Sequence, residues 1–280
     1  GGSLTSTGDI ILGFAGNNNT ATLNVSGGTF NAGTTATKWM SVGTWDTTKG
    51  VVNVSSGNLN LNAGTSIKMN RETGTGANVI TQSGGNVTFF SDNATTAGGT
   101  GVLDMQSRGA AGSSNTYHLN GGTLTANQIT ATMTTTAVPG GPAAAAGTRI
   151  FNFNGGTLKV GSANYASTFF NLGAGGTARA NVRNGGALIN TNGFNVTISQ
   201  PLLHSNIGGD AATDGGLTKS GNGTLTLTGA NTYNGPTAVN AGSLLVTGAG
   251  SLSTTGLTVA SSATFGGAVT INGSVSSSGN

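Results

Sequence analysis

The sequence contains no cysteine, few charged residues and few aromatic residues. Without cysteine, the chain has no disulfide framework and no thiolate metal site. Charged residues make up 6% of the chain, and ten basic against seven acidic residues leave a formal net charge of +3. This small surplus is not clustered with aromatics, so it does not point to a nucleic-acid partner. No apolar run approaches the roughly 20 residues of a membrane-spanning helix, so no membrane span is expected.

What the chain has in excess is glycine, at 51 of 280 residues. Glycine-rich chains of low complexity are often disordered, but disorder also calls for a high net charge, which this chain lacks. The glycines recur between segments in which apolar and polar residues alternate, which is the period of a β-strand. We therefore interpret the glycines as corners between strands.

The segment Phe151-Asn-Phe-Asn-Gly-Gly-Thr-Leu-Lys-Val160 shows the repeated unit most clearly. On each side of its glycine pair, apolar residues alternate with polar ones. Related segments occur at 23–30, 52–59, 80–87, 117–124 and 181–188. We expect the corner glycines to turn the backbone at positive φ, where a side chain is strained. These corner residues are Gly27, Gly28, Gly57, Gly84, Gly85, Gly121, Gly122, Gly155, Gly156, Gly185 and Gly186.

The spacing of the repeats defines the expected architecture. From Gly28 to Gly186 the second glycine of each unit advances by 29, 28, 37, 34 and 30 residues. A further strand, such as 39–42 or 67–69, follows each unit. Because the steps vary while the strands persist, we expect insertions in loops on one side of the molecule. The longest, 134–148, is expected to have no strand of its own.

These features predict one all-β domain over residues 1–280, a single-stranded parallel β-helix (β-solenoid) with roughly three strands per coil and about eight or nine coils. Residues 1–216 form degenerate coils of about 28–37 residues, 217–248 form a distinct repeat, and 249–280 form terminal coils. An antiparallel β-sandwich or a propeller would also have many short strands, but a four-stranded blade needs about 40 residues or more, and the steps here are mostly shorter. The abundant asparagines either form amide ladders between coils or serve as turn residues.

Residues 217–248 resemble a known family, the autotransporter-associated β-strand repeat of bacterial passenger domains. The resemblance lies in Leu-Thr-Lys-Ser-Gly at 217–221, Gly-Thr-Leu-Thr-Leu at 223–227, Gly-Ala-Asn-Thr-Tyr at 229–233 and Ala-Gly-Ser-Leu at 241–244. It implies a right-handed β-helix that is exported and displayed outside the cell, secreted or on the bacterial surface. The repeat is structural and has no catalytic or ligand-binding residues to carry over.

β-Helices also include polysaccharide lyases and hydrolases, whose chemistry needs carboxylates that converge on one groove. The acidic residues are scattered, about one per coil. The closest pair, Asp210 and Asp214, is either a weak calcium candidate or part of a polar connector. His118 and His204 show no metal or triad spacing. We expect no catalytic residue, no metal, no cofactor and no enzymatic activity.

A few side chains are candidates for contact with a surface glycan. Arg149 and Arg179 occupy similar places in successive repeats, either as part of a basic stripe for an anionic glycan or as solvated charges. Trp39 and Trp45 lie near lysines. We expect Trp39 to alternate into the core, which leaves Trp45 as the candidate for stacking on a sugar.

The ends of the chain show coil-like segments and no amphipathic capping helix, so we expect either continuation in a longer chain or head-to-tail self-association through the end coils. The predicted function is that of an extracellular structural element, a building block of a stalk, layer or fibre, with adhesion as an option. The alternative function is a carbohydrate-binding or polysaccharide-cleaving β-helix.

Overall fold

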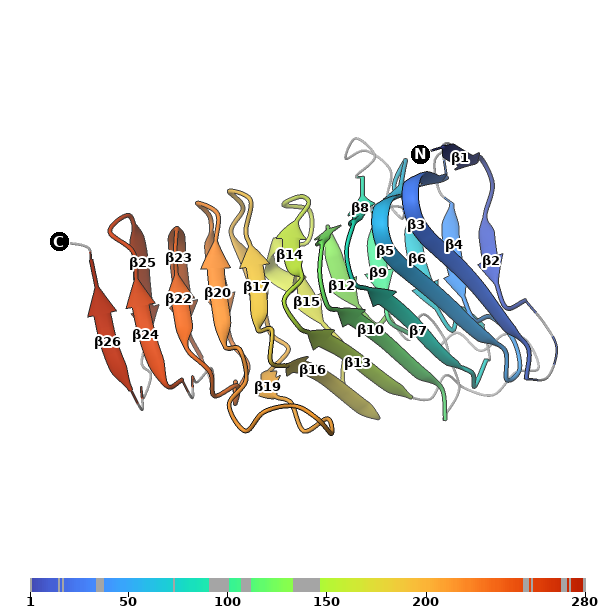
Figure 1. Cartoon of the computed structure of the whole chain (residues 1–280). Coiled ribbons are helices and arrows are strands. Elements are labelled where there is room, and N and C mark those ends of the chain that lie inside the picture. Colours follow the sequence, from blue (N-terminus) through green and yellow to red (C-terminus); the bar gives the residue numbers. More distant parts are fainter. Residues whose placement is uncertain are drawn as a thin grey trace.

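The computed structural model describes residues 2–14, 16, 18–33, 38–72, 74–90, 101–106, 112–132, 147–248, 252, 254–267, 271 and 273–278. Within these residues the chain is almost entirely β-strand, apart from the short 3-10 helix η1 (Ala166–Thr168). The strands pair in parallel and stack along one axis, with the N- and C-termini toward opposite ends (Figure 1). The all-β prediction is confirmed, and the arrangement is consistent with a β-solenoid.

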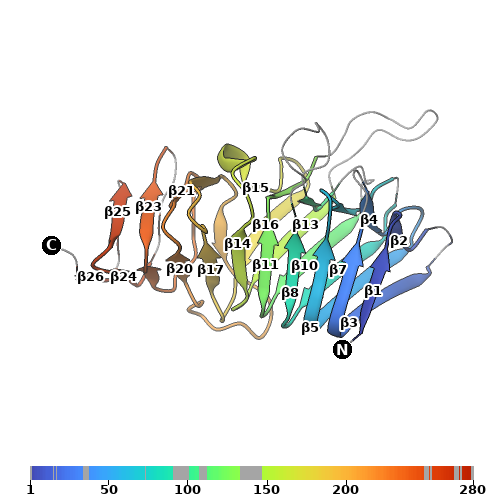
Figure 2. The ribbon, with the colours of Figure 1, turned by 90° about the horizontal axis from the view of Figure 1, so that it is seen from above.

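The strands define three faces, which the chain visits in turn (Figures 1 and 2). The first and second faces belong to one 16-stranded sheet, which is continuous because β3 (Thr20–Ala32) and β5 (Lys49–Leu61) run through both. The first face consists of the N-terminal halves of β3 and β5 together with β7 (Ala77–Gln82), β10 (Ser114–Leu119), β13 (Thr148–Phe153), β16 (Thr177–Val182) and β19 (Leu202–His204).

The second face is built around the C-terminal halves of β3 and β5. Its other strands are β1 (Ser3–Ser6), β8 (Asn86–Phe89), β11 (Thr123–Ala126), β14 (Thr157–Val160), β17 (Ala187–Asn190), β20 (Leu217–Ser220), β22 (Thr237–Val239), β24 (Gly256–Val259) and β26 (Ser274–Ser277). The third face is a separate ten-stranded sheet. It contains β2 (Ile10–Leu12), β4 (Trp39–Val42), β6 (Ser66–Met69), β9 (Val102–Asp104), β12 (Gln128–Thr130), β15 (Phe170–Asn171), β18 (Val196–Ile198), β21 (Thr224–Leu227), β23 (Gly242–Val246) and β25 (Ala263–Gly267).

The register places equivalent residues of successive repeats above one another. On the second face, one inward column runs through Leu4, Phe30, Leu59, Val87, Leu124, Leu158, Ile189, Lys219, Val239, Val259 and Ser277. From Leu59 to Val239 every member is fully buried. On the first face Tyr117 stacks on Phe151 with ring centroids 5.1 Å apart, and Phe170 of the third face meets Phe151 at 5.2 Å. The interior therefore consists largely of ladders of apolar side chains, and Lys219 is the charged member of the second-face column.

The glycine pairs lie at the corner between the first and second faces, but the two glycines of a pair differ. Gly85 has φ 63°, whereas Gly84 lies outside the left-handed region, and a Cβ on Gly84 would overlap the carbonyl oxygen of Ser55. Positive φ occurs at Gly27, Gly28, Gly57, Gly85, Gly122, Gly155 and Gly186. The expectation of positive φ is wrong for Gly84, Gly121, Gly156 and Gly185. These four lack a side chain because the neighbouring repeat approaches too closely to admit one.

The links at the other two corners vary in length. Between the second and third faces, β8 and β9 are joined by residues 90–101 but β11 and β12 by residue 127 alone. Between the third and first faces, β12 and β13 are joined by residues 131–147 but β18 and β19 by residues 199–201. Insertions therefore occur at two corners rather than on the single side expected. The predicted insertion 134–148 lies outside the described residues except for its last two, and Thr148 already begins β13.

The repeat shortens after β19. The inward column of the second face advances by 28 to 37 residues per step from Phe30 to Lys219, and then by 20, 20 and 18 residues. Where the structure describes the chain beyond β19, each full repeat contributes two strands instead of three. The buried Tyr233, whose N–H donates to the Leu202 carbonyl, takes up the position of the missing strand. Leu252 and Ile271 follow at intervals of 19 residues and also pack on the core.

Three glycine-to-alanine substitutions separate backbone strain from overlap between repeats. Gly122 has φ 69° and a Cβ there would overlap backbone of Gly84 and Gly85, whereas Gly193 has φ 86° and open space. Gly208 has open space and no left-handed φ. We expect Gly122→Ala to lower the free energy of unfolding by more than about 2 kcal/mol, Gly193→Ala by about 1 kcal/mol, and Gly208→Ala to change it little. Urea denaturation measures all three, and equal losses would contradict the role of overlap.

Candidate functional site

The arginine predicted to contact a glycan lies in the interior. Arg149 is fully buried, and burial lowers its pKa. Its Nη1 donates to Oε1 of Gln106 at 3.1 Å, and its Nη2 donates to the carbonyl oxygens of Ala174 and Gly175. The prediction that Arg149 contacts a glycan at the surface is therefore wrong. The side chain instead connects the first face to the loop before β16.

Arg179 does not stand above Arg149, because the register pairs Arg149 with Ala178 and Ile150 with Arg179. The two arginines thus project to opposite sides of the first face. Arg179 is half-buried, and its Nε donates to Oδ1 of Asn181 at 3.1 Å. The structure does not bring the two arginines together into one stripe, and glycan contact through Arg179 alone remains a prediction.

Trp39 was expected inside, but it lies on the outer side of the third face, while its neighbour Met40 is buried. The indole ring is 5.1 Å from Nζ of Lys68 and 4.3 Å from Cζ of Arg71, both within the range of cation–π attraction. Trp45 is half-buried in the turn between β4 and β5. Sugar stacking on Trp45 remains a prediction.

The weak calcium candidate consists of two carboxylates that already have partners. Asp210 forms a bidentate ion pair with Arg183, with Nε to Oδ2 at 2.8 Å and Nη2 to Oδ1 at 2.9 Å. The hydroxyl of Ser205 also donates to Asp210. The hydrogen bond from Arg183 lowers the pKa of Asp210. In the part of the chain that the structure covers, no group of three or more His, Asp or Glu residues could hold a metal ion.

Asp214 has a different environment, with a side chain that is 1% exposed. Its Oδ1 accepts the backbone N–H of Gly216 at 2.9 Å and of Gly235 at 2.8 Å. Its Oδ2 accepts the N–H of Asn234 at 2.9 Å and lies 2.8 Å from Nδ1 of His204. One carboxylate thus connects three successive repeats, through His204, Gly216 and Gly235, at the point where the repeat becomes shorter. This arrangement favours the connector interpretation of the pair.

His118 is half-buried on the first face, where its Nδ1 lies 3.1 Å from Nδ2 of Asn152. Burial lowers its pKa, and the charge of Arg183 adds to this effect. His118 and His204 therefore have separate partners.

Lys219 is the charged residue that the sequence interpretation overlooked. It stands in the inward column of the second face and is fully buried. Its Nζ donates to the carbonyl oxygens of Ser220 at 3.2 Å, Gly221 at 2.6 Å and Ala241 at 2.8 Å. The ammonium group thereby links one short repeat to the next. Lys219 lies two residues after Leu217 in the same β-strand, so the alternation of the strand predicts that both side chains point to the same side.

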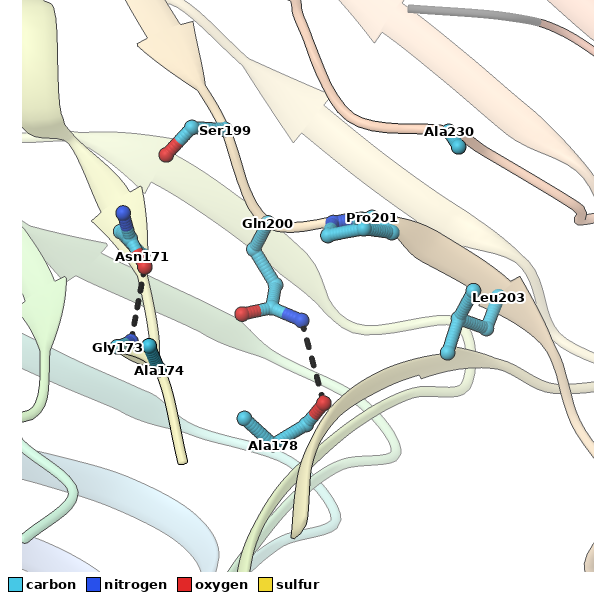
Figure 3. A pocket seen from close by; sticks show the side chains of 9 residues that line it. All are labelled: Asn171, Gly173, Ala174, Ala178, Ser199, Gln200, Pro201, Leu203 and Ala230. Atoms are coloured by element: carbon cyan, nitrogen blue, oxygen red, sulfur yellow. Dashed lines mark hydrogen bonds between the residues drawn. The ribbon is translucent and has the colours of Figure 1, made fainter. Parts of the chain in front are cut away.

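A hollow of about 480 Å³ opens between the third and first faces near the last three-stranded repeats (Figure 3). Its lining residues are Asn171, Gly173, Ala174, Ala178, Ser199, Gln200, Pro201, Leu203 and Ala230. Gln200 is buried and braces the hollow, since its Oε1 accepts the N–H of Leu172 at 3.2 Å and its Nε2 donates to the carbonyl oxygen of Ala178 at 3.4 Å. Sequence inspection missed Gln200, because nothing local distinguishes it from other polar loop residues.

The chemistry of this hollow is limited by its lining, which contains no ionisable side chain. It therefore supplies no general acid, general base or charged metal ligand. Its volume lies within the range of small-molecule sites, and its alanine, proline and amide groups suit a neutral ligand.

Comparison with known proteins identifies one part of the chain. Residues 217–246 match the family model of the passenger-associated transport repeat. This match confirms the resemblance predicted for residues 217–248 and indicates, in general terms, a secreted or cell-surface protein. No curated protein and no solved structure matches the chain. Among the residues placed in the structure, no helix has the length and hydropathy to cross a membrane.

The role of Asp214 can be tested with Asp214→Asn. The amide would turn an N–H₂ group toward backbone donors, leaving buried N–H groups unpaired at about 1–3 kcal/mol each. We expect a loss of unfolding free energy of about 2–4 kcal/mol in urea denaturation. Asp46→Asn, the same substitution in an exposed loop, is the control and should change stability by less than about 0.5 kcal/mol. Similar losses in both variants would contradict the assignment.

Lys219 makes a prediction about pH. Burial lowers its pKa to about 8, whereas an unfolded lysine titrates near 10.4. Between these values the unfolded chain binds more protons, so this residue makes the free energy of unfolding rise with pH from about 8 to about 10. The slope should disappear in Lys219→Met. Burial raises the pKa of Tyr117 and Tyr233 in both proteins, so the difference between them isolates Lys219. If the difference in unfolding free energy between the two proteins does not change with pH, this would show that the three carbonyl groups keep the ammonium group of Lys219 charged.

Proposed function

We propose that this chain is a structural part of an extracellular passenger-type protein, in which a right-handed parallel β-solenoid forms a stalk, layer or fibre. The observation that carries the proposal is the continuous parallel pairing of strands, which runs from β1 through the repeat matched at 217–246 to β26. A structure that grows by stacking is rigid and long without one large core. Those are the properties that a structural element needs.

The proposal includes the absence of enzymatic activity. Supporting it, the carboxylates considered for calcium bind backbone N–H groups or Arg183, and the hollow of Figure 3 is uncharged. Asp104, also buried, accepts hydrogen bonds from Thr132 and Gln106, and its burial raises its pKa. Each of these carboxylates is held by hydrogen bonds within the fold.

Growth by stacking also supports the proposed self-association or continuation of the solenoid. Leu4 on β1 is 63% exposed and Val275 on β26 is 61% exposed. A further coil, supplied by the same chain or by a second copy, would cover these side chains and pair the strand edges. Adhesion is a separate proposal, which concerns the outward side chains of one face of the solenoid.

Electron microscopy of the purified protein tests this proposal. We expect either filaments with an axial repeat of one chain length, which would identify head-to-tail assembly, or uniform short rods, which would identify one segment of a longer stalk. Compact particles would contradict the solenoid. Release of reducing ends from polysaccharides would contradict the structural assignment.

A further inference from the structure

We propose that the outer side of the second face binds a neutral, extended polysaccharide that lies along the axis of the solenoid. This inference goes beyond the structural role proposed above. It rests on the outward side chains of one face, so it can fail while the structural role stands.

Two outward columns run along this face, on either side of the inward column. The first column contains Ser3, Thr29, Asn58, Asn86, Thr123, Thr157, Leu188, Thr218, Ala238, Thr258 and Ser276. The second contains Thr5, Asn31, Asn60, Thr88, Thr125, Lys159, Asn190 and Ser220. Lys159 is the one charged member, and Leu188 and Ala238 are the apolar ones. The surface is otherwise composed of hydroxyl and amide groups.

The outward side chains of the other faces differ in character. The first face presents Val51, Val79 and Ile150 in one outward column, which also includes Arg179. The third face carries Trp39 with its two cations. The first face also has an outward column of uncharged groups, Asn24, Asn53 and Thr81, but this column continues into His118 and into the buried Asn152 and Asn181. The second face is therefore the surface on which uncharged hydrogen-bonding groups predominate in both outward columns. Hydroxyl and amide groups both donate and accept, as the hydroxyl groups of a sugar do.

Hydrogen bonds between neighbouring repeats hold part of this surface in place. Asn60 donates to Oδ1 of Asn31 at 2.9 Å, and Asn86 donates to Oδ1 of Asn58 at 2.9 Å. These amide ladders fix side-chain rotamers before any ligand arrives, which lowers the entropy cost of binding. Some asparagines thus form ladders, whereas Asn18, Asn70 and Asn192 have positive φ and serve in turns, so both uses that the sequence left open occur.

The geometry of the columns favours a polymer as the occupant. Neighbouring members are about 4.8 Å apart along the axis, and the two columns are separated by about 6.6 Å. A linear glycan offers hydroxyl groups on every ring, at a repeat comparable with the strand separation. Each contact is weak, but many are made along one chain, and binding strength accumulates. Since the face has almost no charge, an anionic polymer gains nothing from it.

A second copy of this protein is a poorer fit to the same face. Eleven strands at about 4.8 Å and a width of about 10 Å give an area of roughly 500 Å². A standard protein interface needs about 800 Å² from each partner. A flat strip of this size therefore suits an extended ligand better than a dimer.

Co-sedimentation of the whole chain with microcrystalline cellulose and with chitin tests the inference. The test variant is Thr125→Glu with Asn190→Asp, which places two charges on the second face. The control is Thr116→Glu with Thr177→Glu, which places them on the outer side of the first face in the same two repeats. We expect the unmodified protein and the control to bind one of the solids, and the test variant to bind at least roughly tenfold less.

Circular dichroism and thermal unfolding establish that both variants are folded. Should the double variant unfold, Asn190→Asp alone takes its place, since it is isosteric and keeps the acceptor for the N–H of Asn192. No binding of the unmodified protein to either solid, or equal binding by all variants, would overturn the inference. Retention on heparin in place of the neutral solids would also overturn it, by assigning an anionic ligand.

Discussion

The stacking of each strand on its equivalent in the next repeat is the constraint on which the rest of this structure depends. Parallel pairing at about 4.8 Å brings side chains of the same position into contact, so each column must consist of residues that tolerate their own kind. Apolar residues and amides do so, but like charges repel one another. A chain in which 6% of residues are charged satisfies this requirement almost everywhere. At the glycine corners the backbones of neighbouring repeats approach closely, and a residue without a side chain tolerates this contact with its equivalent.

Three buried polar side chains lie where the stacking changes, in a chain that buries others elsewhere. At the transition from three strands per repeat to two, the ladder cannot continue on the first face, and backbone groups there need other partners. Asp214 accepts three backbone N–H groups, Lys219 donates to three carbonyl groups, and Tyr233 fills the interior. Their charges and hydroxyl groups stabilise an irregularity in a regular fold.

Much of the fold could be predicted from the alternation of apolar and polar residues and from the spacing of the glycines. The positions of several candidate site residues were predicted wrongly, although the sequence held part of the information needed. Arg149, Phe151 and Phe153 are alternate residues of one strand, so alternation alone predicts that Arg149 points inward. The prediction failed because arginine side chains are usually exposed. In Trp39-Met40 two apolar neighbours compete for the interior, and alternation cannot choose between them. Two partners of Asp214, the N–H groups of Asn234 and Gly235, lie 20 and 21 residues away in another repeat, and no local pattern reveals them. The shortening after β19 was visible only as a change in spacing between strands.

That shortening also has a mechanical meaning. A repeat with three strands has ladder hydrogen bonds on three sides, whereas a repeat with two strands has them on two sides and packs Tyr233, Leu252 or Ile271 at the third. We expect the second kind of repeat to bend more readily toward its third side. The loop between β19 and β20, held by Asp210 and Asp214, joins the two kinds of cross-section. When a rod of this shape is pulled sideways at one end, the strain concentrates at the change in cross-section. The two carboxylates therefore reinforce the place where the rod would otherwise bend first.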